Sequence, residues 1–328
     1  MKNAVFDAEI AEGPANSSAY WLNTEDGVRL RIGLWKPDTA ALGSVLVFPG
    51  RGECVEKYGR NAAEFGKYGY ATLVIDWRGQ GLSDRLTGDR MVGHVLRFSD
   101  YHKDVAAMLK AAEDLELPKP WHLFGHSMGA CIGLRALING LPVVSCGFTA
   151  PMWGIKMTAF QRLIALPLSW ATQTLGKGHV YVPGDKGQER KSYVLSVDFQ
   201  DNRLTSSADM YDYMINLATE LPDRQTAAPS MGWLYQALRE CKALSSMPSP
   251  NIPCLAFCGD KDELVDISAV QDRMSRWDEG QFKMIRDAKH DVLSELPEIR
   301  EPAIASFCRL FLKAEGADLP RDFSTRWD

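Results

Sequence analysis

The sequence has no long hydrophobic run, and this absence excludes a membrane-embedded protein. No stretch approaches the roughly 20 consecutive apolar residues that a membrane-spanning helix needs. The stretch 1–18, MKNAVFDAEIAEGPANSS, has no apolar segment of the kind found in secretory signals. We therefore expect neither a transmembrane segment nor a secretory signal.

The sequence also lacks paired cysteines and long basic runs. Its seven cysteines are odd in number, and none forms a Cys-x-x-Cys pair. We interpret them as small buried side chains in a reducing compartment, with no metal site. The net charge is -5, which argues against nucleic acid as a partner. The composition thus predicts a cytoplasmic protein without metal or organic cofactor, and it does not define an oligomeric state.

What is present is an alternation of short apolar runs with helical patterns, which predicts an α/β fold with a mostly parallel sheet covered by helices on both faces. Residues 1–19 are expected to be a loose lead-in. The alternating segment 28–35, VRLRIGLW, predicts an antiparallel edge strand. The other predicted strands are 44–48, 71–75, 121–124, 145–149, 252–258 and 282–285. Predicted helices cover about 56–68, about 99–115 with Ser99 as N-cap, about 128–139, and 298–313.

The alternation stops between the strand near 148 and the strand near 255. The simplest organisation is a core made of 1–150 and 249–314, a cap inserted at 151–248, and a tail at 315–328. Such an insertion would lie over the carboxyl edge of the sheet, where ligands bind in these folds. The cap contains two greasy stretches, PMWGI at 151–155 and LIALPLSW at 163–170. They predict either an acyl-chain channel that contacts lipid surfaces or simple packing of the cap on the core.

The stretch 121–139, WHLFGHSMGACIGLRALIN, indicates a strand, a Gly-x-Ser-x-Gly turn and a helix. Such a turn forces Ser127 into a strained backbone and exposes its hydroxyl at the end of the sheet. The N–H of Met128, at the start of the following helix, could stabilise an oxyanion. The alternative is a glycine-rich connection without chemistry, so a partner histidine and acid are needed to decide.

His290 is the candidate base, because it follows a predicted strand in a loop that leads into the last helix. The other histidines are interpreted as surface or packed residues. The candidate acid is Asp262 in GDKDELVD, with Asp260 in reserve, although an aspartate there could also cap the helix near 267. The order Ser127, Asp262, His290 is that of α/β hydrolases.

The loop PGRGE after the strand 44–48 is expected to supply the second oxyanion donor, the N–H of Arg51. Gly50 would allow the backbone to approach the substrate closely. In DWRGQGLSD, Asp76 and Arg78 could pair across a turn, which we interpret as scaffold beneath the site.

Four blocks, PGRGE with KYGRNAAEF, DWRGQGLSD, GHSMG, and GDKDELVD with AKHDVLSELPE, bracket residues 45–312. They resemble the serine-hydrolase branch of the α/β-hydrolase fold that includes monoacylglycerol lipases and bacterial lysophospholipase L2. The resemblance implies that the second aspartate of GDKD, Asp262, is the acid. One position departs from the family pattern, because Pro49 stands where these enzymes usually carry histidine.

Together these observations predict a serine carboxylic-ester hydrolase. The resemblance implies a mono-acylated lipid substrate, either a lysophospholipid or a monoacylglycerol. Met152, Trp153 and Gly50 are the predicted substrate contacts. We expect the cap to contact a membrane surface transiently, which would make the protein cytoplasmic or peripheral to the inner membrane face.

Several rivals share the predicted triad. A proline-iminopeptidase-like enzyme would need acidic cap residues for a substrate amine, for which Asp185, Glu189 or Asp198 could serve. A cofactor-free perhydrolase and a carbon–carbon bond hydrolase use the same motifs. Dehalogenases and epoxide hydrolases are disfavoured because they carry aspartate in place of Ser127. Outside catalysis, a ligand-binding receptor could keep the same fold.

Overall fold

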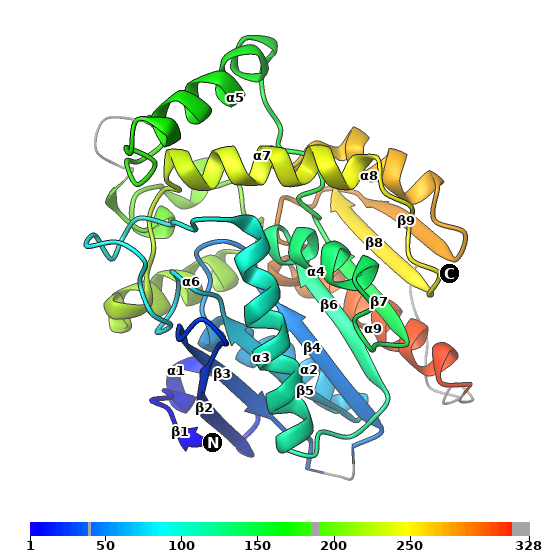
Figure 1. Cartoon of the computed structure of the whole chain (residues 1–328). Coiled ribbons are helices and arrows are strands. Elements are labelled where there is room, and N and C mark those ends of the chain that lie inside the picture. The colour runs from blue at the N-terminus through cyan, green and yellow to red at the C-terminus, as the bar shows by residue number, and fades with distance from the viewer. Residues whose placement is uncertain (39–40, 185–189, 317–328) are drawn as a thin grey trace.

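A single sheet of nine strands organises the described part of the chain, in the order β1-β2-β3-β5-β4-β6-β7-β8-β9 (Figure 1). The coordinates are a computed structural model, and they describe residues 1–38, 41–184 and 190–316. Strands β4 to β9 pair in parallel, whereas β1, β2 and β3 form an antiparallel extension beside β5. The prediction of a mostly parallel α/β sheet is confirmed.

The parallel strands follow the apolar runs of the sequence. They are β4 (Gly43–Phe48), β5 (Tyr70–Asp76), β6 (Trp121–His126), β7 (Ser145–Thr149), β8 (Cys254–Gly259) and β9 (Gly280–Ile285). All except β9 are buried along their whole length, because helices cover both faces of the sheet.

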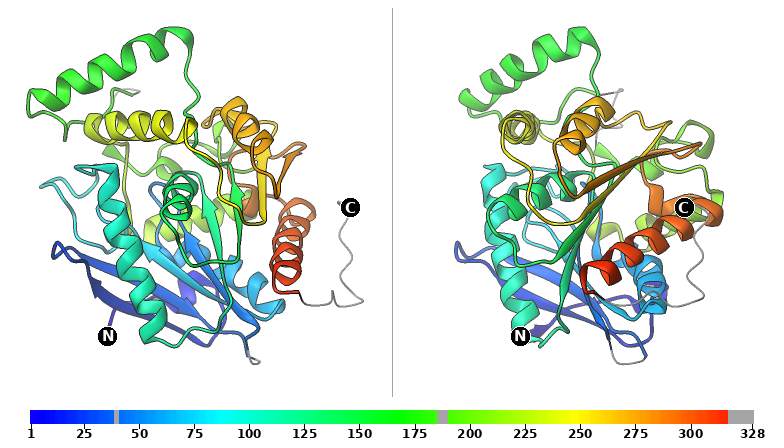
Figure 2. Two further views of the ribbon diagram at one scale, coloured as in Figure 1. Left: turned by 45° about the vertical axis from the view of Figure 1, so that its right-hand side comes forward. Right: turned by 90° about the vertical axis from the view of Figure 1, so that its right-hand side faces the viewer.

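Helices form two layers around this sheet (Figure 2). On one face, α3 (Tyr101–Asp114), α4 (Met128–Ile138) and α8 (Ile267–Ser275) enclose the larger hydrophobic cluster. On the other face, α2 (Gly59–Lys67) and α9 (Pro297–Ala314) enclose a second cluster around Phe65 and Phe307. The predicted N-cap of the helix near 99 is wrong: Ser99 lies in a 3-10 turn, η2 (Phe98–Asp100), that precedes α3.

The N-terminal segment is more ordered than expected. It contains β1 (Lys2–Asn3), α1 (Ala8–Ala11) and β2 (Ser17–Asn23), so the predicted loose lead-in is wrong. Strand β3 (Arg29–Trp35) is antiparallel as predicted, but it lies between β2 and β5 and is not an edge. Strand β2 was not predicted, because its half-polar sequence has too weak an alternation to be distinguished from a loop.

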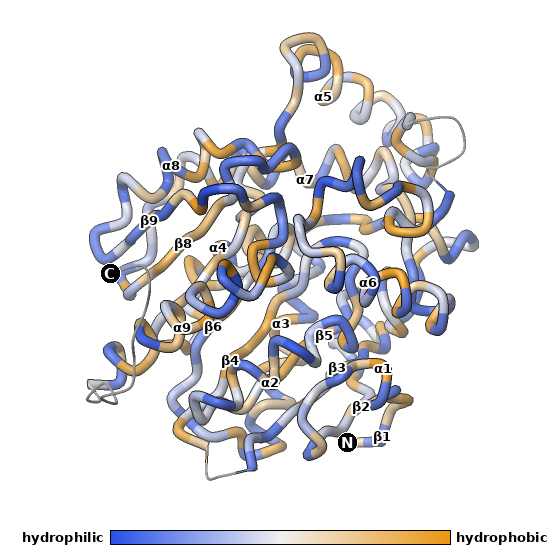
Figure 3. The backbone as a smooth tube through the Cα atoms, turned by 180° about the vertical axis from the view of Figure 1, so that it is seen from behind, coloured by the Kyte–Doolittle hydropathy of each residue, from blue (hydrophilic) through white to orange (hydrophobic). Residues whose placement is uncertain are grey.

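In its described residues, the segment between β7 and β8 contains three helices, α5 (Ala159–Thr174), α6 (Ala208–Glu220) and α7 (Met231–Ser245). Short 3-10 turns η4 (Tyr193–Leu195), η5 (Phe199–Asp201) and η6 (Pro222–Arg224) connect them. In Figures 1 and 2, α5 stands apart from the body and rests on α7. Figure 3 shows hydrophobic stretches on this outlying helix as well as on the central strands.

A buried ion network joins the extension of the sheet to the loop after β5. Arg31 is fully buried and pairs with Asp76 and Glu56, both at 2.7 Å. Arg78 instead pairs with Asp104 at 2.7 Å and Asp26 at 3.0 Å. The predicted pairing of Asp76 with Arg78 is therefore wrong, because each carboxylate and guanidinium already has nearer partners.

Two absences bear on the sequence analysis. Within the described ranges, no helix is long and apolar enough to cross a membrane. All seven cysteines are free and buried, as predicted for small apolar side chains.

The tail predicted at 315–328 lies outside the described residues beyond 316. Its first residue, Glu315, accepts hydrogen bonds from His122 at 2.8 Å and from Tyr70 at 2.9 Å.

Candidate active site

Ser127 lies in a sharp turn between β6 and α4, where its backbone has φ 50° and ψ -115°. A positive φ is strained for a residue with a side chain, and such strain concentrates at functional sites. The two glycines of the motif are required by close packing. A Cβ at Gly129 would lie 1.9 Å from the carbonyl oxygen of Phe48, and one at Gly125 would lie 2.9 Å from the backbone of Ala130.

The structure brings the three predicted triad residues together. The Nε2 atom of His290 lies 3.0 Å from the hydroxyl of Ser127, and its Nδ1 atom lies 2.7 Å from the carboxylate of Asp262. The loop that carries His290 is held against the cap, because the N–H of His290 donates to the carbonyl of Arg203 at 3.3 Å. This is the geometry of a nucleophile, a base and an orienting acid.

Asp262 is buried and ionised by its surroundings. Burial would raise the pKa of its carboxyl, but the hydrogen bond with His290 and two backbone N–H groups outweigh it and lower the pKa below its usual value. Those N–H groups belong to Leu264 and Val265, at 2.7 and 3.1 Å. The geometry therefore favours Asp262 over the reserve candidate.

The other two aspartates of GDKDELVD have different surroundings. The side chain of Asp260 is exposed to solvent. Asp266 is the N-cap of α8, where it accepts a hydrogen bond from the N–H of Ser268 at 3.2 Å. The capping role foreseen for one of these aspartates thus belongs to Asp266.

The two backbone N–H groups predicted to bind an oxyanion are those of Arg51 and Met128. Within the described ranges, the N–H groups of Arg51 and Met128 donate to no protein acceptor. The N–H of Gly50, in contrast, donates to the carboxylate of Glu53 at 2.6 Å. The turn of Pro49 is held by its carbonyl, which accepts a hydrogen bond from the indole of Trp77 at 3.0 Å. Backbone donors free to bind an oxyanion are what acyl transfer needs.

The side chain of Arg51 connects this loop to the cap. Its guanidinium donates to the carbonyl of Ala227 at 2.7 Å and lies over the ring of Trp233 at 5.7 Å. Burial lowers the pKa of Arg51 to about 10, so the group remains a cation at neutral pH. The oxyanion loop and the cap are thereby fixed relative to each other.

Two of the predicted substrate contacts, Met152 and Trp153, lie in different surroundings. Met152 contacts Ser127 through its backbone, because its N–H donates to the carbonyl of Ser127 at 3.0 Å. Trp153 lies in the core, where its indole donates to the carbonyl of Ala130 at 3.2 Å and stacks on Trp277. A substrate contact by either side chain stays a prediction.

Sequence reasoning missed a group of charged residues beneath the turn. Glu53, Lys57 and Asp291 lie close to His126, whose ring centroid is 5.0 Å from that of His290. Burial lowers the pKa of His126, which keeps its ring neutral at pH 7. A signal was present, because Asp291 directly follows the candidate base and Glu53 belongs to PGRGE.

A family model described as serine aminopeptidase, S33, matches residues 39–297. That match covers most of the chain and contains all three triad candidates. The chain belongs to the serine aminopeptidase S33 family. Membership agrees with the resemblance stated from the motifs, and it fixes the fold as that of an α/β hydrolase.

Relatives within this family carry lipase names. The chain is 27% identical over 277 residues to a probable lysophospholipase L2 of Haemophilus influenzae, covering 83% of this chain and 85% of the relative. It is 28% identical over 280 residues to lysophospholipase L2 of Escherichia coli strain K12, covering 81% of this chain and 79% of the relative.

Solved structures agree on the fold. The chain superposes on a soluble variant of monoglyceride lipase from Saccharomyces cerevisiae with a TM-score of 0.69 and 16% identity. That superposition covers 89% of this chain and 94% of the lipase. At this level of identity the likeness supports the α/β-hydrolase fold alone.

Proposed function

We propose that this protein is a serine carboxylic-ester hydrolase. The observation that carries the proposal is the hydrogen-bonded series from the hydroxyl of Ser127 through His290 to the buried carboxylate of Asp262. A serine hydroxyl is a weak nucleophile unless a base accepts its proton, and a base needs an acid to hold its tautomer. All three groups lie in contact here, at the end of the sheet where ligands bind in this type of fold.

Each residue then has one role. The Ser127 oxygen attacks the ester carbonyl while His290 accepts its proton, and Asp262 stabilises the imidazolium that forms. The N–H groups of Arg51 and Met128 bind the oxyanion of the tetrahedral intermediate. His290 next donates the proton to the leaving alcohol, which leaves an acyl group on Ser127. Water, deprotonated by His290, attacks this acyl-enzyme and releases the carboxylic acid.

The proposed substrate is a mono-acylated lipid, either a lysophospholipid or a monoacylglycerol. Support comes from the names of the relatives, lysophospholipase L2 and monoglyceride lipase. The fold itself leaves the substrate open. The reaction as written uses only groups of the chain and water.

Helix α5 supports the lipid assignment independently. Six large apolar side chains on α5 and just after it are exposed to solvent, with exposed fractions between 37% and 74%. They are Phe160, Leu163, Leu166, Leu168, Trp170 and Leu175. Apolar side chains gathered on one outlying helix favour contact with a lipid surface. We propose that this helix rests transiently on the membrane from which the substrate is taken, at the cytoplasmic face.

The family description is consistent with one alternative function, that of a peptidase that removes an N-terminal residue. Such an enzyme needs acidic side chains in the cap to bind the substrate amine. Of the three candidates, Asp198 is exposed to solvent. Asp185 and Glu189 lie outside the described residues. Perhydrolase and carbon–carbon hydrolase activities would use the same triad, and a receptor would not use it.

Labelling with a fluorophosphonate tests the proposal against the receptor alternative. This probe forms a covalent bond with an activated serine, and mass spectrometry of the digested protein locates the adduct. We expect one adduct, on Ser127, and none in the His290→Ala protein, because the base activates the serine. A folded wild-type protein that forms no adduct would contradict the proposed function.

A further inference from the structure

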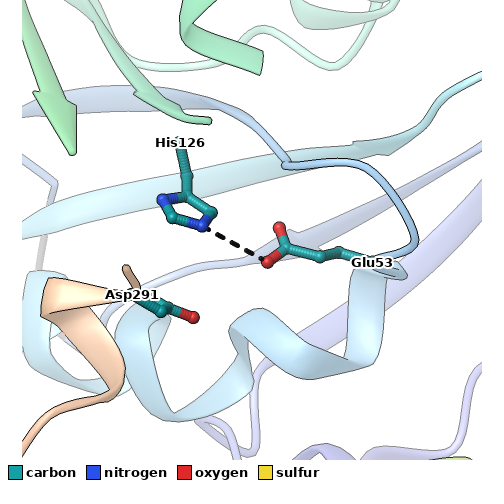
Figure 4. A group of neighbouring side chains, drawn as sticks. All are labelled: Glu53, His126 and Asp291. Atoms are coloured by element: carbon teal, nitrogen blue, oxygen red, sulfur yellow. Dashed lines mark ion pairs between the residues drawn. The ribbon is translucent and has the colours of Figure 1, made fainter. Parts of the chain in front are cut away.

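A buried ion bridge lies directly beneath the candidate site. It consists of the carboxylates of Glu53 and Asp291 with the ammonium of Lys57 between them. Their side chains are only 12%, 6% and 12% exposed, respectively. Figure 4 shows both carboxylates near the ring of His126. Buried charges are costly to desolvate, so a group of three needs a structural or functional explanation.

The arrangement could be mistaken for a metal site. The ligand atoms of Glu53, His126 and Asp291 lie within 4.8 Å of one another. The ammonium of Lys57, however, already binds both carboxylates, at 2.5 Å in the case of Asp291. Burial would lower the pKa of Lys57, but Asp291 and Glu53 outweigh it and hold the pKa above its usual value. The cation of this cluster is therefore the lysine.

One end of the bridge holds the oxyanion loop. The carboxylate of Glu53 accepts hydrogen bonds from the N–H of Gly50 and the hydroxyl of Tyr58, both at 2.6 Å. Gly50 directly precedes Arg51, whose N–H is the proposed oxyanion donor. The position of Glu53 therefore fixes the direction of this part of the backbone, where Pro49 replaces the histidine usual in similar enzymes.

The other end of the bridge holds the loop of the base. Asp291 directly follows His290, and its carboxylate binds Lys57 and accepts a hydrogen bond from the hydroxyl of Ser294 at 2.8 Å. The N–H of Asp291 donates to the carbonyl of Leu204 in the cap at 2.8 Å. Lys57 thus binds a residue 234 positions later in the sequence and connects the loop of Glu53 to the loop of the base.

We propose that Lys57 is a positioning residue of ester hydrolysis, which sets the oxyanion loop and the loop of His290 at a fixed distance by joining Glu53 to Asp291. The inference rests on the proposed esterase function. The oxyanion donor and the base must act on one tetrahedral intermediate, and a misplacement of about 1 Å costs about 100-fold in rate. A buried ion pair between residues far apart in the sequence can hold two loops at a fixed distance.

The bridge also carries charge toward the base. Two carboxylates and one ammonium give a net negative charge, separated from His290 by the neutral ring of His126. The charged group that contacts His290 directly is Asp262, at 2.7 Å. Negative charge on both sides of the imidazole stabilises the imidazolium that forms in the transition state.

The first test replaces the cation. Lys57→Met should lower kcat on a soluble short-chain ester about 100-fold and change KM by no more than about twofold, because alignment and not binding is lost. Lys57→Arg, which keeps the cation, should recover most of the rate. The matched control is Lys67→Met in helix α2, because Lys67 is 65% exposed and its one ion pair among the described residues is with Glu64 of the same helix. That control should retain the wild-type rate.

The second test removes negative charge while preserving shape, and it serves even if Lys57→Met folds poorly. Asp291→Asn and Glu53→Gln should each lower kcat on the short-chain ester and change KM by no more than about twofold, because each variant releases one loop from Lys57. A defect that merely loosens the fold would lower the yield of active enzyme and the thermal stability without this division between kcat and KM.

The outcomes separate two failures. An active wild type, with unchanged kcat in both charge variants and no recovery in Lys57→Arg, would overturn this inference alone. A wild type that hydrolyses no ester would overturn the proposed function, and the inference with it.

Discussion

The core beneath the cap and the outlying helix α5 differ in which side chains they bury. Around Ser127, polar and charged groups are buried, and the triad and ion bridge are hydrogen-bonded within the protein. On α5, large apolar groups such as Phe160 and Leu163 face solvent. Buried polar networks fix geometry, whereas exposed apolar surface marks a place of contact. The comparison teaches that the proposed chemistry and the proposed substrate delivery would belong to separate regions.

The largest effect should come from the core. Ser127→Ala should lower ester hydrolysis about 10⁵-fold, because the attacking oxygen is lost, and His290→Ala should do the same. Initial rates on a chromogenic short-chain ester measure both. Retention of more than a few per cent of the rate in either variant would remove the basis for assigning the chemistry to this region.

The choice of acid gives the next largest effect. Asp262→Asn should lower kcat about 10⁴-fold, because an amide leaves the imidazole of His290 in the wrong tautomer. Asp260→Asn should stay within about twofold of wild type, since that side chain is exposed. Parallel kcat measurements on the two proteins decide the matter. Equal losses in both would contradict the assignment of Asp262.

The delivery role of α5 predicts a smaller and selective effect. The double substitution Phe160→Ser and Leu163→Ser should lower hydrolysis of a lipid presented in vesicles about tenfold, because apolar area that enters the membrane is lost. A water-soluble ester measured in parallel should be hydrolysed at the wild-type rate. Equal losses on both substrates would show that α5 supports the fold and not delivery.

Stability should respond to pH through carboxylates buried near the site. The pKa values of Asp262, Asp291 and Glu53 lie below their usual range. A carboxyl with a lowered pKa in the folded state stabilises the fold fully above its unfolded pKa of about 4. That stability declines as pH drops below this value and is lost as pH falls through the lower folded-state pKa. Thermal unfolding from pH 7 to pH 3 should therefore show a falling Tm below about pH 5. A smaller fall in Asp291→Asn would assign part of it to the bridge.

Much of the core could be predicted because its signals are local. The glycines around Ser127 are required by contacts of 1.9 to 2.9 Å, so the motif itself encodes the turn. His290 and Asp262 each follow a short apolar strand, and parallel strands place their carboxyl ends at one edge of the sheet. Sequence order was therefore sufficient to bring the triad candidates to one place.

The sequence analysis missed the ion bridge and the N-terminal strand for a shared reason. Lys57 and Arg31 are charged residues in patterns typical of solvated faces, and only distant partners show why they are buried. Strand β2 likewise has a weak pattern and is defined by its pairing with β3. Non-local pairing decides both features, and a single sequence does not display it.

The most direct test of the account is fatty-acid release from lysophosphatidylcholine and from monoolein, measured side by side with the Ser127→Ala protein as blank. We predict release well above the blank from at least one of these lipids. Faster release from lysophosphatidylcholine would identify a lysophospholipase, and faster release from monoolein a monoacylglycerol lipase. Release from neither lipid above the blank would contradict the proposed function as a hydrolase of mono-acylated lipids.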